Sequence, residues 1–338
     1  MKLVRRLLDR DDAPPVAIVD PRFRTVATPL SRQDLAPLAP ECETVQFSSL
    51  LPDRDFQRLA DLLERHPSVR LRAFGGYDGS IRDLEFLRFF PRLRRFEATS
   101  LRYREFAGLD GLRHLPEDVV DLAIGQFRRP TSLAPLRRFE ALERLFIEGP
   151  TKDIDLVAGL SRLDDLTLRS VRIGSLDRLR PLERLRSLDL KLGSVDSLDE
   201  LPVLPRLRYL ELWRVRGITD LSAITRNPTI QWLYLQDLAQ VASLPDLSPM
   251  TELRRVTIVN LKQLDDLAPL AAAPNLEELQ IWESKTLPPT ALAALNGHPT
   301  LATVSLGLGS KRRNAAVEDA IGLPSTPGGG RFEFREHD

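Results

Sequence analysis

The sequence predicts an α/β solenoid, in which short repeated units build one curved, parallel β-sheet. The first observation is a strand motif, L-x-x-L-x-L, where L is an apolar residue and x is any residue. Its copies in residues 207–281 begin at Leu207, Ile230, Leu253 and Leu276, which are 23 residues apart. The second observation is that apolar residues between the copies recur at every third position. The third is a proline that precedes many of the strand motifs at a fixed distance.

Each unit reads as one strand followed by a short helical turn. Within a copy, the last two apolar residues alternate with exposed ones, as in a strand with one buried face. The three-residue spacing of Ile218, Leu221 and Ile224 suits a turn or two of 3₁₀ or α-helix. A unit of this size cannot bury its apolar face alone, so neighbouring units must stack into a solenoid.

The register of the repeats extends over most of the chain. The first apolar position of the motif falls at Leu93, Val119, Leu142, Leu163, Leu185, Leu207, Ile230, Leu253, Leu276 and Leu301. A proline stands two residues before the motif at Pro91, Pro205, Pro228, Pro274 and Pro299. Proline ends a helical turn and forces its predecessor into an extended conformation, so it supports the same register. Asp220 and Asp266 stand where a side chain can cap the convex turn.

These motifs resemble the leucine-rich repeat family. The period near 22, with D-L-x-x-L between strands, is most similar to its short-repeat class, which includes internalins and protein-phosphatase regulators. The resemblance implies that the sheet lines a concave face into which the x residues point. It also implies a rigid binding scaffold without catalytic activity.

The sequence departs from the family pattern at one position. The family places Asn three residues after the last strand leucine, where this chain has Pro150, Val171, Gly193, Val215, Leu238, Leu261, Ser284 and Gly309. Backbone groups at that bend must therefore pair with one another or with water. The Val and Leu residues are expected to extend the apolar core.

We expect three segments: an N-terminal cap at residues 1–66, a repeat array at 67–309 and a C-terminal cap at 310–338. The first cap contains an amphipathic helix at about residues 53–66, with Asp53 or Asp55 as its N-cap and Pro67 as its stop. This helix is expected to cover the open edge of the first repeat. Residues 16–19, 44–47 and 68–73 read as strands, and residues 75–79 as a turn rather than a phosphate-binding loop.

The C-terminal cap is expected to hold a short helix at residues 315–321, capped by Asn314, followed by a glycine-rich linker. Residues 331–335 alternate like a strand, with Phe332 and Phe334 on one face. We interpret this segment as an edge-covering strand. The alternative is a disordered tail that carries a short docking motif.

Composition limits the partners. The chain of 338 residues carries 48 basic and 48 acidic residues, so no net charge steers it toward nucleic acid or an anionic membrane. Basic doublets such as Arg94-Arg95 could trace a nucleic-acid track, but aligned acids in the same columns argue against one. The single cysteine, Cys42, excludes an internal disulfide, and the start is too weakly apolar for a signal peptide. We expect a cytoplasmic protein with neither a membrane span nor a metal site.

The aromatic residues gather on the predicted concave face. All three tryptophans and two of the four tyrosines fall in the exposed columns of the motif. The candidate protein-binding residues are Tyr209, Glu211, Trp213, Trp232, Tyr234, Gln236, Arg255 and Trp282. Trp, Tyr and Arg dominate binding hot spots, which favours an interaction patch. The alternative is an aromatic ladder that packs on itself and stabilises the sheet.

Catalysis has little support in the sequence. The four histidines are scattered, and His66 and His298 each precede a proline at a repeat boundary, where a turn role is favoured. Cys42 has no identifiable histidine partner. We therefore predict no catalytic residues and no cofactor. The predicted function is a monomeric protein–protein interaction module, acting as an inhibitor or scaffold, and the alternative is a self-associating assembly protein.

Overall fold

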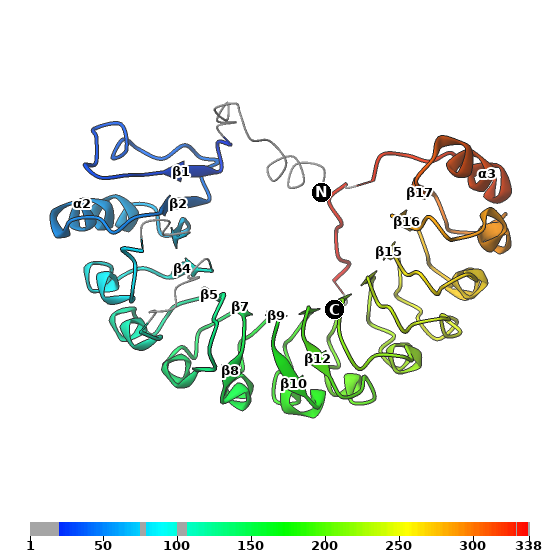
Figure 1. The fold of residues 1–338 in the computed structure, drawn as a ribbon, viewed down its shortest axis with the longest axis horizontal. Coiled ribbons are helices and arrows are strands. Elements are labelled where there is room, and N and C mark those ends of the chain that lie inside the picture. The colour runs from blue at the N-terminus through cyan, green and yellow to red at the C-terminus, as the bar shows by residue number, and fades with distance from the viewer. Residues whose placement is uncertain (1–19, 75–78, 100–106, 329, 337–338) are drawn as a thin grey trace.

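One parallel sheet runs the length of the molecule and curves into an arc (Figure 1). The computed structural model describes residues 20–74, 79–99, 107–328 and 330–336. Within these residues the sheet has 13 strands in sequence order. They are β1 (Phe23–Thr25), β2 (Thr44–Phe47), β3 (Arg70–Ala73), β4 (Arg95–Ala98), β5 (Asp121–Gly125), β7 (Arg144–Glu148), β9 (Asp165–Arg169), β11 (Ser187–Lys191), β13 (Tyr209–Trp213), β14 (Trp232–Gln236), β15 (Arg255–Val259), β16 (Glu278–Trp282) and β17 (Thr303–Gly307). The predicted solenoid is confirmed.

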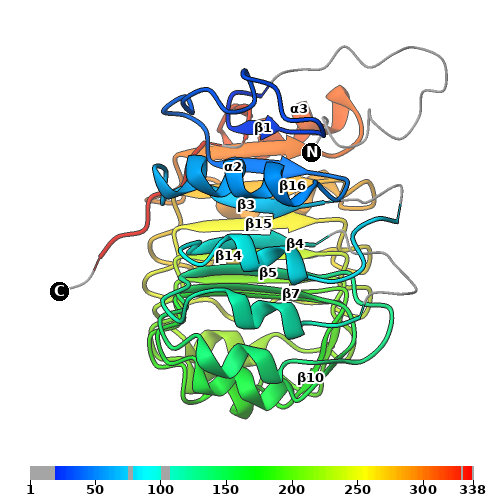
Figure 2. The same ribbon diagram turned by 90° about the vertical axis from the view of Figure 1, so that its left-hand side faces the viewer.

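Short 3₁₀ helices form the outer, convex layer (Figures 1 and 2). They are η1 (Glu85–Phe89), η2 (Asp110–His114), η3 (Ala134–Arg138), η4 (Ile154–Gly159), η5 (Leu176–Leu179), η6 (Leu201–Val203), η7 (Ser222–Arg226), η8 (Ala268–Ala272) and η9 (Pro289–Leu295). Two minor parallel pairs lie beside the main sheet, namely β6 (Thr131–Ser132) with β8 (Thr151–Lys152) and β10 (Arg172–Gly174) with β12 (Ser194–Val195). Asp220 and Asp266 accept N–H bonds from Ser222 (2.9 Å) and Ala268 (2.8 Å), as their predicted capping role requires.

The core lies between the sheet and the convex helices. Every unit contributes the same inward positions, so that Leu207, Leu210 and Leu212 are all fully buried. Burying one such side chain contributes about 1.5–3 kcal/mol. Because the units stack, these contributions add along the solenoid axis and the core is continuous.

The bend after each strand replaces the missing asparagine with a backbone ladder. One residue per unit adopts a left-handed conformation there, for example Ser170 (φ 57°), Leu192 (φ 56°) and Arg214 (φ 49°). Its N–H donates to the last carbonyl of the next strand, as Leu192 does to Trp213 at 2.8 Å. The bond offsets a conformational cost of roughly 1–2 kcal/mol.

The residues that stand in place of asparagine behave as the sequence predicts. Val171, Val215, Leu238 and Leu261 are all buried in the core. Gly193 is different, because a Cβ atom there would lie 2.1 Å from the Val171 carbonyl oxygen. The expected pairing of backbone groups and the extension of the core are both confirmed.

The N-terminal helix α2 (Asp53–Glu64) buries the predicted face, including Phe56, Leu59 and Leu62. It is capped at Pro52 rather than by Asp53 or Asp55, because Asp55 turns inward to accept the Leu30 N–H at 3.1 Å. The helix lies on the convex side between β2 and β3, beside η1, rather than over an open edge (Figure 1). The expectation that it covers the edge is wrong, because its position is that of a convex turn.

The sheet itself passes through residue 66 without a break, since β2 pairs with β3. The division into two caps and an array therefore stays a prediction. The expected strand at residues 16–19 and most of the turn at residues 75–79 lie outside the described residues.

The C-terminal helix α3 (Lys311–Ile321) begins earlier than predicted. Its N-cap is Ser310, whose side chain accepts the Arg313 N–H at 3.3 Å. Asn314 does not cap this helix, because its amide instead bonds the backbone of Leu306 on β17 and of Leu308 just after that strand. Residues 331–335 are extended but form no strand, so the predicted edge strand is wrong. Only Ser325 pairs with the last strand, through a single bridge to Val304.

None of the helices in the described part of the chain combines the length and the apolar character that a membrane crossing requires.

Candidate binding surface on the concave face

The strand register brings the predicted residues into rows across the sheet. Tyr209, Trp232 and Arg255 are register partners on β13, β14 and β15. Glu211 and Tyr234 form the next row toward the strand ends, and Trp213 and Gln236 the row after that. These seven residues therefore occupy one contiguous area, because the strands are parallel and each repeat has the same length.

The centre of this area is an aromatic and cationic stack. The rings of Tyr209 and Trp232 meet edge to face, with centroids 4.9 Å apart. The Arg255 guanidinium lies 4.7 Å from the Trp232 ring and is ion-paired with Glu278. Trp232 also donates its indole N–H to Thr257 at 3.1 Å. The stack is thus fixed in position from both sides, which reduces the entropy lost on binding.

The second part of the area lies nearer the strand ends. Trp213 donates its indole N–H to Asp237 at 3.2 Å, and the Arg169 guanidinium lies 5.0 Å from its ring. Tyr234 donates to Gln236 at 2.9 Å, and burial raises the pKa of its phenol to about 12. These side chains are half-buried and already hydrogen-bonded, which is what a self-packed ladder requires as well.

Trp282 does not join the other tryptophans. It is the register partner of Val259, so that β14 and β15 separate it from Trp213. Its nearest described neighbours include Gly307 on β17 and Gly328 from the C-terminal segment. In the sequence, Trp282 falls in an exposed column of the strand motif and was therefore grouped with the other aromatic residues. In the structure, the strand register places it to one side of them.

A charged cluster borders the aromatic area. Lys191 is ion-paired with Asp189 (2.7 Å) and with Glu211 (3.0 Å). Burial disfavours the lysine charge, but the two carboxylates outweigh it and raise the pKa of Lys191. Burial and the adjacent Asp189 carboxyl raise the pKa of Glu211 to about 7. Glu211 also accepts the Tyr209 hydroxyl at 2.8 Å, so the cluster is tied to the aromatic centre.

The C-terminal segment, residues 325–328 and 330–336, contacts this same surface, which the sequence did not predict. In Figure 1 it runs from α3 through the inside of the arc, and Figure 2 shows it beside one edge of the sheet. Its contacts with Arg186, Arg208 and Gln231 identify that edge as the one where the strands begin. Phe332 packs on Trp232 with ring centroids 5.4 Å apart, and Phe334 packs on Phe332 at 4.9 Å. The signal available in the sequence was the alternation of Phe332 and Phe334 after a glycine-rich linker.

His114 and His298 have structural partners, and His114 lies 3.1 Å from a Glu85 carboxylate oxygen. His298 accepts the Leu301 N–H at 3.2 Å, and its other ring nitrogen lies 3.1 Å from the Ala273 carbonyl oxygen. This geometry holds a turn at a repeat boundary. In the described ranges, no group of three or more His, Cys, Asp or Glu side chains is arranged to hold a metal ion.

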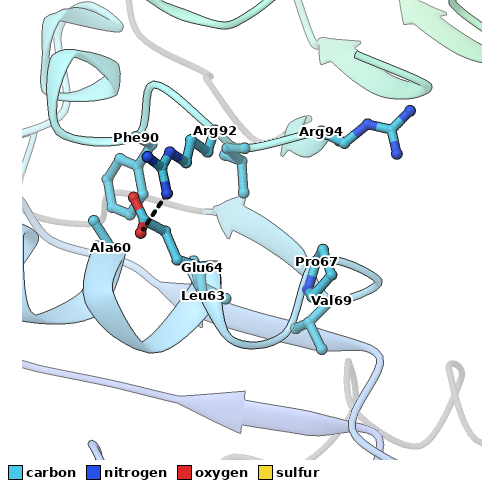
Figure 3. Close-up of a pocket in the computed structure, with 9 residues that line it drawn as sticks. Ala60, Leu63, Glu64, Pro67, Val69, Phe90, Arg92 and Arg94 are labelled. Carbon is cyan, nitrogen blue, oxygen red and sulfur yellow. Dashed lines mark hydrogen bonds and ion pairs between the residues drawn. The ribbon is translucent and has the colours of Figure 1, made fainter. Parts of the chain in front are cut away.

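A shallow pocket lies at the other end of the molecule, between α2 and the loop before β4 (Figure 3). Apolar atoms of Ala60, Leu63 and Phe90 form its floor, and an ion pair between Glu64 and Arg92 (3.4 Å) crosses its mouth. The pair is exposed to solvent, so it contributes little and selects no ligand.

Comparison with known proteins identifies similar folds. A scan against models of protein families gives no match, and a search of curated proteins gives none either. Among solved structures, an internalin from Listeria monocytogenes is 17% identical with a TM-score of 0.53, covering 86% of this chain and 82% of its own. An internalin C2 of the same species has a TM-score of 0.44 and 21% identity, covering 53% of this chain and 77% of its own. A leucine-rich repeat protein of Leptospira interrogans has a TM-score of 0.46 and 13% identity, covering 84% of this chain and 89% of its own.

The parallel sheet of short strands, the 3₁₀ turns behind it and the likeness to the first internalin agree with one another. The chain is therefore a leucine-rich repeat solenoid with internalin-like structural neighbours.

Proposed function

We propose that this protein is a non-enzymatic, cytoplasmic interaction module that binds a protein partner on its concave face. Leucine-rich repeat proteins are typically interaction modules and generally non-catalytic. Binding would act by rigid display, because the sheet and its side-chain bonds already hold the surface in place. The consequence for the partner is inhibition or assembly into a complex.

The observation that carries the proposal is that this surface already holds a peptide. The stack of Tyr209, Trp232 and Arg255 is in contact with an extended segment of the chain through Phe332. A surface that packs a phenylalanine between an indole and a guanidinium has the composition of a binding hot spot. The proposed site comprises these residues with Glu211, Trp213, Tyr234, Gln236 and Trp282 around them.

The test is affinity capture from native extract with matched variants. The baits are the intact chain, the triple variant Tyr209→Ala, Trp232→Ala, Tyr234→Ala, and the control Phe23→Ala. Phe23 is an exposed aromatic residue (38%) on β1, at the far end of the sheet. Circular dichroism and the unfolding midpoint must first show that all three are folded.

We expect one partner to be captured by the intact chain and by the Phe23→Ala control, and lost from the triple variant. Equal capture of the partner by all three baits would show that it does not bind at the aromatic residues of the concave face.

Self-association is the alternative function, and one observation favours it. A segment joined to the array through a glycine-rich linker has the connectivity that exchange between two copies requires. Light scattering across a concentration series separates the two functions. A dimer that dissociates on Trp232→Ala supports self-association, whereas a monomer at all concentrations supports a foreign partner.

A further inference from the structure

The C-terminal segment makes two kinds of contact. Its first part, Ser325 and Thr326, is tied to the last strand, since Thr326 donates its N–H to Val304 at 2.8 Å and accepts the Ser305 hydroxyl at 2.9 Å. Its second part, residues 330–336, has left the last strand and runs along the edge of the sheet where β15, β14, β13 and β11 begin (Figures 1 and 2). An edge cap needs only the first part, so the second part requires another explanation.

The second part is held through its backbone. Gln231, which precedes β14 and is fully buried, donates to the Arg335 carbonyl at 2.9 Å and accepts the Arg335 N–H at 2.8 Å. Arg254 donates to the Glu333 carbonyl at 2.8 Å, and Arg255 donates to the Gly330 carbonyl at 3.2 Å. Bonds to main-chain groups of three residues of the segment recognise an extended peptide whatever its sequence.

Side chains add sequence preference to this backbone recognition. Phe332 lies against the Trp232 ring, with the guanidinium groups of Arg254 and Arg255 at 5.2 and 4.8 Å from its centroid. Arg335 is ion-paired with Glu277 at 2.5 Å. The surface therefore fits an aromatic residue, and a basic residue three positions later.

Positively charged side chains bind the end of the segment. Glu336 is ion-paired with Arg208 at 2.9 Å and with Arg186 at 3.2 Å, and both arginines precede strands of the concave sheet. The side chains of the segment that the surface contacts are thus one aromatic (Phe332), one basic (Arg335) and one acidic (Glu336), and Phe334 packs on Phe332.

The docked segment has the features of a displaceable ligand. Phe334 is 40% exposed, and the ion pairs of Arg335 and Glu336 are exposed at their outer ends. Exposed ion pairs contribute about 0–1 kcal/mol each. The covalent link raises the local concentration of the segment to roughly millimolar, which compensates for weak contacts.

The linker is shaped for close approach to the sheet. A Cβ atom at Gly328 would lie 2.7 Å from the Trp282 ring and 2.9 Å from the Ser305 hydroxyl oxygen. Only glycine allows the backbone to pass directly over these groups. Trp282 thus guides the linker onto the face, which accounts for its place apart from the other tryptophans.

We propose that the surface formed by Gln231, Trp232, Arg254 and Arg255 is the receptor for an extended segment of a protein partner, with two aromatic residues two positions apart followed by a basic one. Residues 330–336 are the intramolecular competitor of that segment. This inference rests on the proposed function and specifies the chemistry of its ligand.

The test uses full-length chains and a fluorescein-labelled peptide with the sequence of residues 328–338. The competitor is weakened in the double variant Phe332→Ala, Phe334→Ala. Its matched control is Arg331→Ala, Glu333→Ala, whose side chains are exposed and form no hydrogen bond or ion pair with the described part of the chain. Fluorescence anisotropy gives the Kd of each protein for the peptide.

We expect the double variant to bind the peptide at least about tenfold more tightly than the intact chain, because its own segment no longer competes. The control should match the intact chain. Adding Trp232→Ala to the double variant should abolish binding, and a peptide with both phenylalanines replaced by alanine should bind none of the proteins.

Two results would overturn the inference. Equal affinity of the intact chain and the double variant for the peptide, or binding by neither, would make the docked segment purely structural. A dimer of the intact chain that dissociates on Phe332→Ala, Phe334→Ala would show that the segment serves a second copy instead.

The proposed function would survive either result if capture of a partner still depended on the concave aromatics. The opposite outcome is tight peptide binding together with partner capture that is unchanged in the triple variant. It would contradict the proposed partner site and show that this surface binds only the protein's own C-terminal segment.

Discussion

The two halves of the concave sheet share one scaffold and differ in what satisfies their exposed side chains. Around β3 to β7, charged side chains pair with those of neighbouring strands. Asp121 is 3% exposed and is ion-paired with Arg70 (2.6 Å), Arg144 (2.9 Å) and Arg95 (3.5 Å). Around β13 to β15, part of the surface is satisfied only by residues 330–336, which arrive from more than 70 positions away in sequence. In one half the side chains pair with those of neighbouring strands, and in the other some of them pair with the C-terminal segment.

The comparison shows which feature of the repeats differs between the two halves. Both halves present alternating residues at the same register, so backbone geometry cannot distinguish them. The difference lies in the side chains alone. Local ion pairs in the first half leave little to offer a partner, whereas the indole, guanidinium and amide groups of the second half accept a peptide.

The largest expected effect tests whether the scaffold is uniform. Leu122 on β5 and Leu210 on β13 are both fully buried at equivalent positions. We expect Leu122→Ala and Leu210→Ala each to cost about 2–5 kcal/mol, because each leaves a similar cavity. Urea unfolding measures both, and costs that differ by more than about 2 kcal/mol would show that the halves differ in their cores too.

The next effect concerns the half around β3 to β7. Removing the carboxylate in Asp121→Ala leaves three arginines without their shared partner, so we expect a loss of about 2–3 kcal/mol. Asp118→Ala is the control, because its pair with Arg94 is exposed (61% and 45%) and such pairs contribute about 0–1 kcal/mol. If both variants lowered the midpoint of thermal unfolding by the same amount, the buried ion-pair cluster would not be what stabilises this half of the sheet.

A pH effect is expected at the boundary between the halves. Burial, with repulsion from Asp189, raises the pKa of Asp165 from 3.8 to about 6. The folded state therefore binds this proton more tightly than the unfolded state, so ionisation of Asp165 costs stability as the pH rises through about 6. Asp165→Asn should gain about 1–2 kcal/mol at pH 8, and the gain should vanish near pH 4.

Unfolding midpoints of this variant and the intact chain across that pH range provide the measurement. A stability gain of Asp165→Asn that grew as the pH fell would contradict a raised pKa of Asp165.

The smallest effect on stability concerns the half around β13 to β15. We expect Phe332→Ala, Phe334→Ala to change the unfolding free energy by less than about 1 kcal/mol, because the segment adds few buried contacts. Hydrogen exchange should show the local effect. The Arg335 amide, bound to Gln231, should exchange faster, while the Thr326 amide, bound to Val304, should stay protected. Faster exchange at both amides would mean that the segment and the last strand form one unit.

Much of the fold could be predicted because the residue pattern within each repeat specifies its strand and its convex turn. The strand frame, the convex turns and the buried Val171, Val215, Leu238 and Leu261 all follow from patterns within about 25 residues. The rows of candidate residues followed as well, since equal repeats keep a constant register. Whether those residues bind a partner stays a prediction.

Two of the predictions that were wrong concern the residues that cap the helices. Asp55 was expected to cap α2, but it turns toward Leu30, which lies 25 positions earlier. Asn314 was expected to cap α3, but the loop after β17 uses its amide. In each case the sequence offers a polar side chain with a local role, and tertiary packing gives it a different partner.

The sequence by itself determined the solenoid, its register and the gathering of aromatic residues on one face, because these depend on periodicity and on the alternation of strand side chains. Only the tertiary structure decided what covers that face. The contact of Phe332 with Trp232 joins residues 100 positions apart through a glycine-rich linker. No local pattern specifies the path of such a linker, so its docking place is set by the surface that receives it.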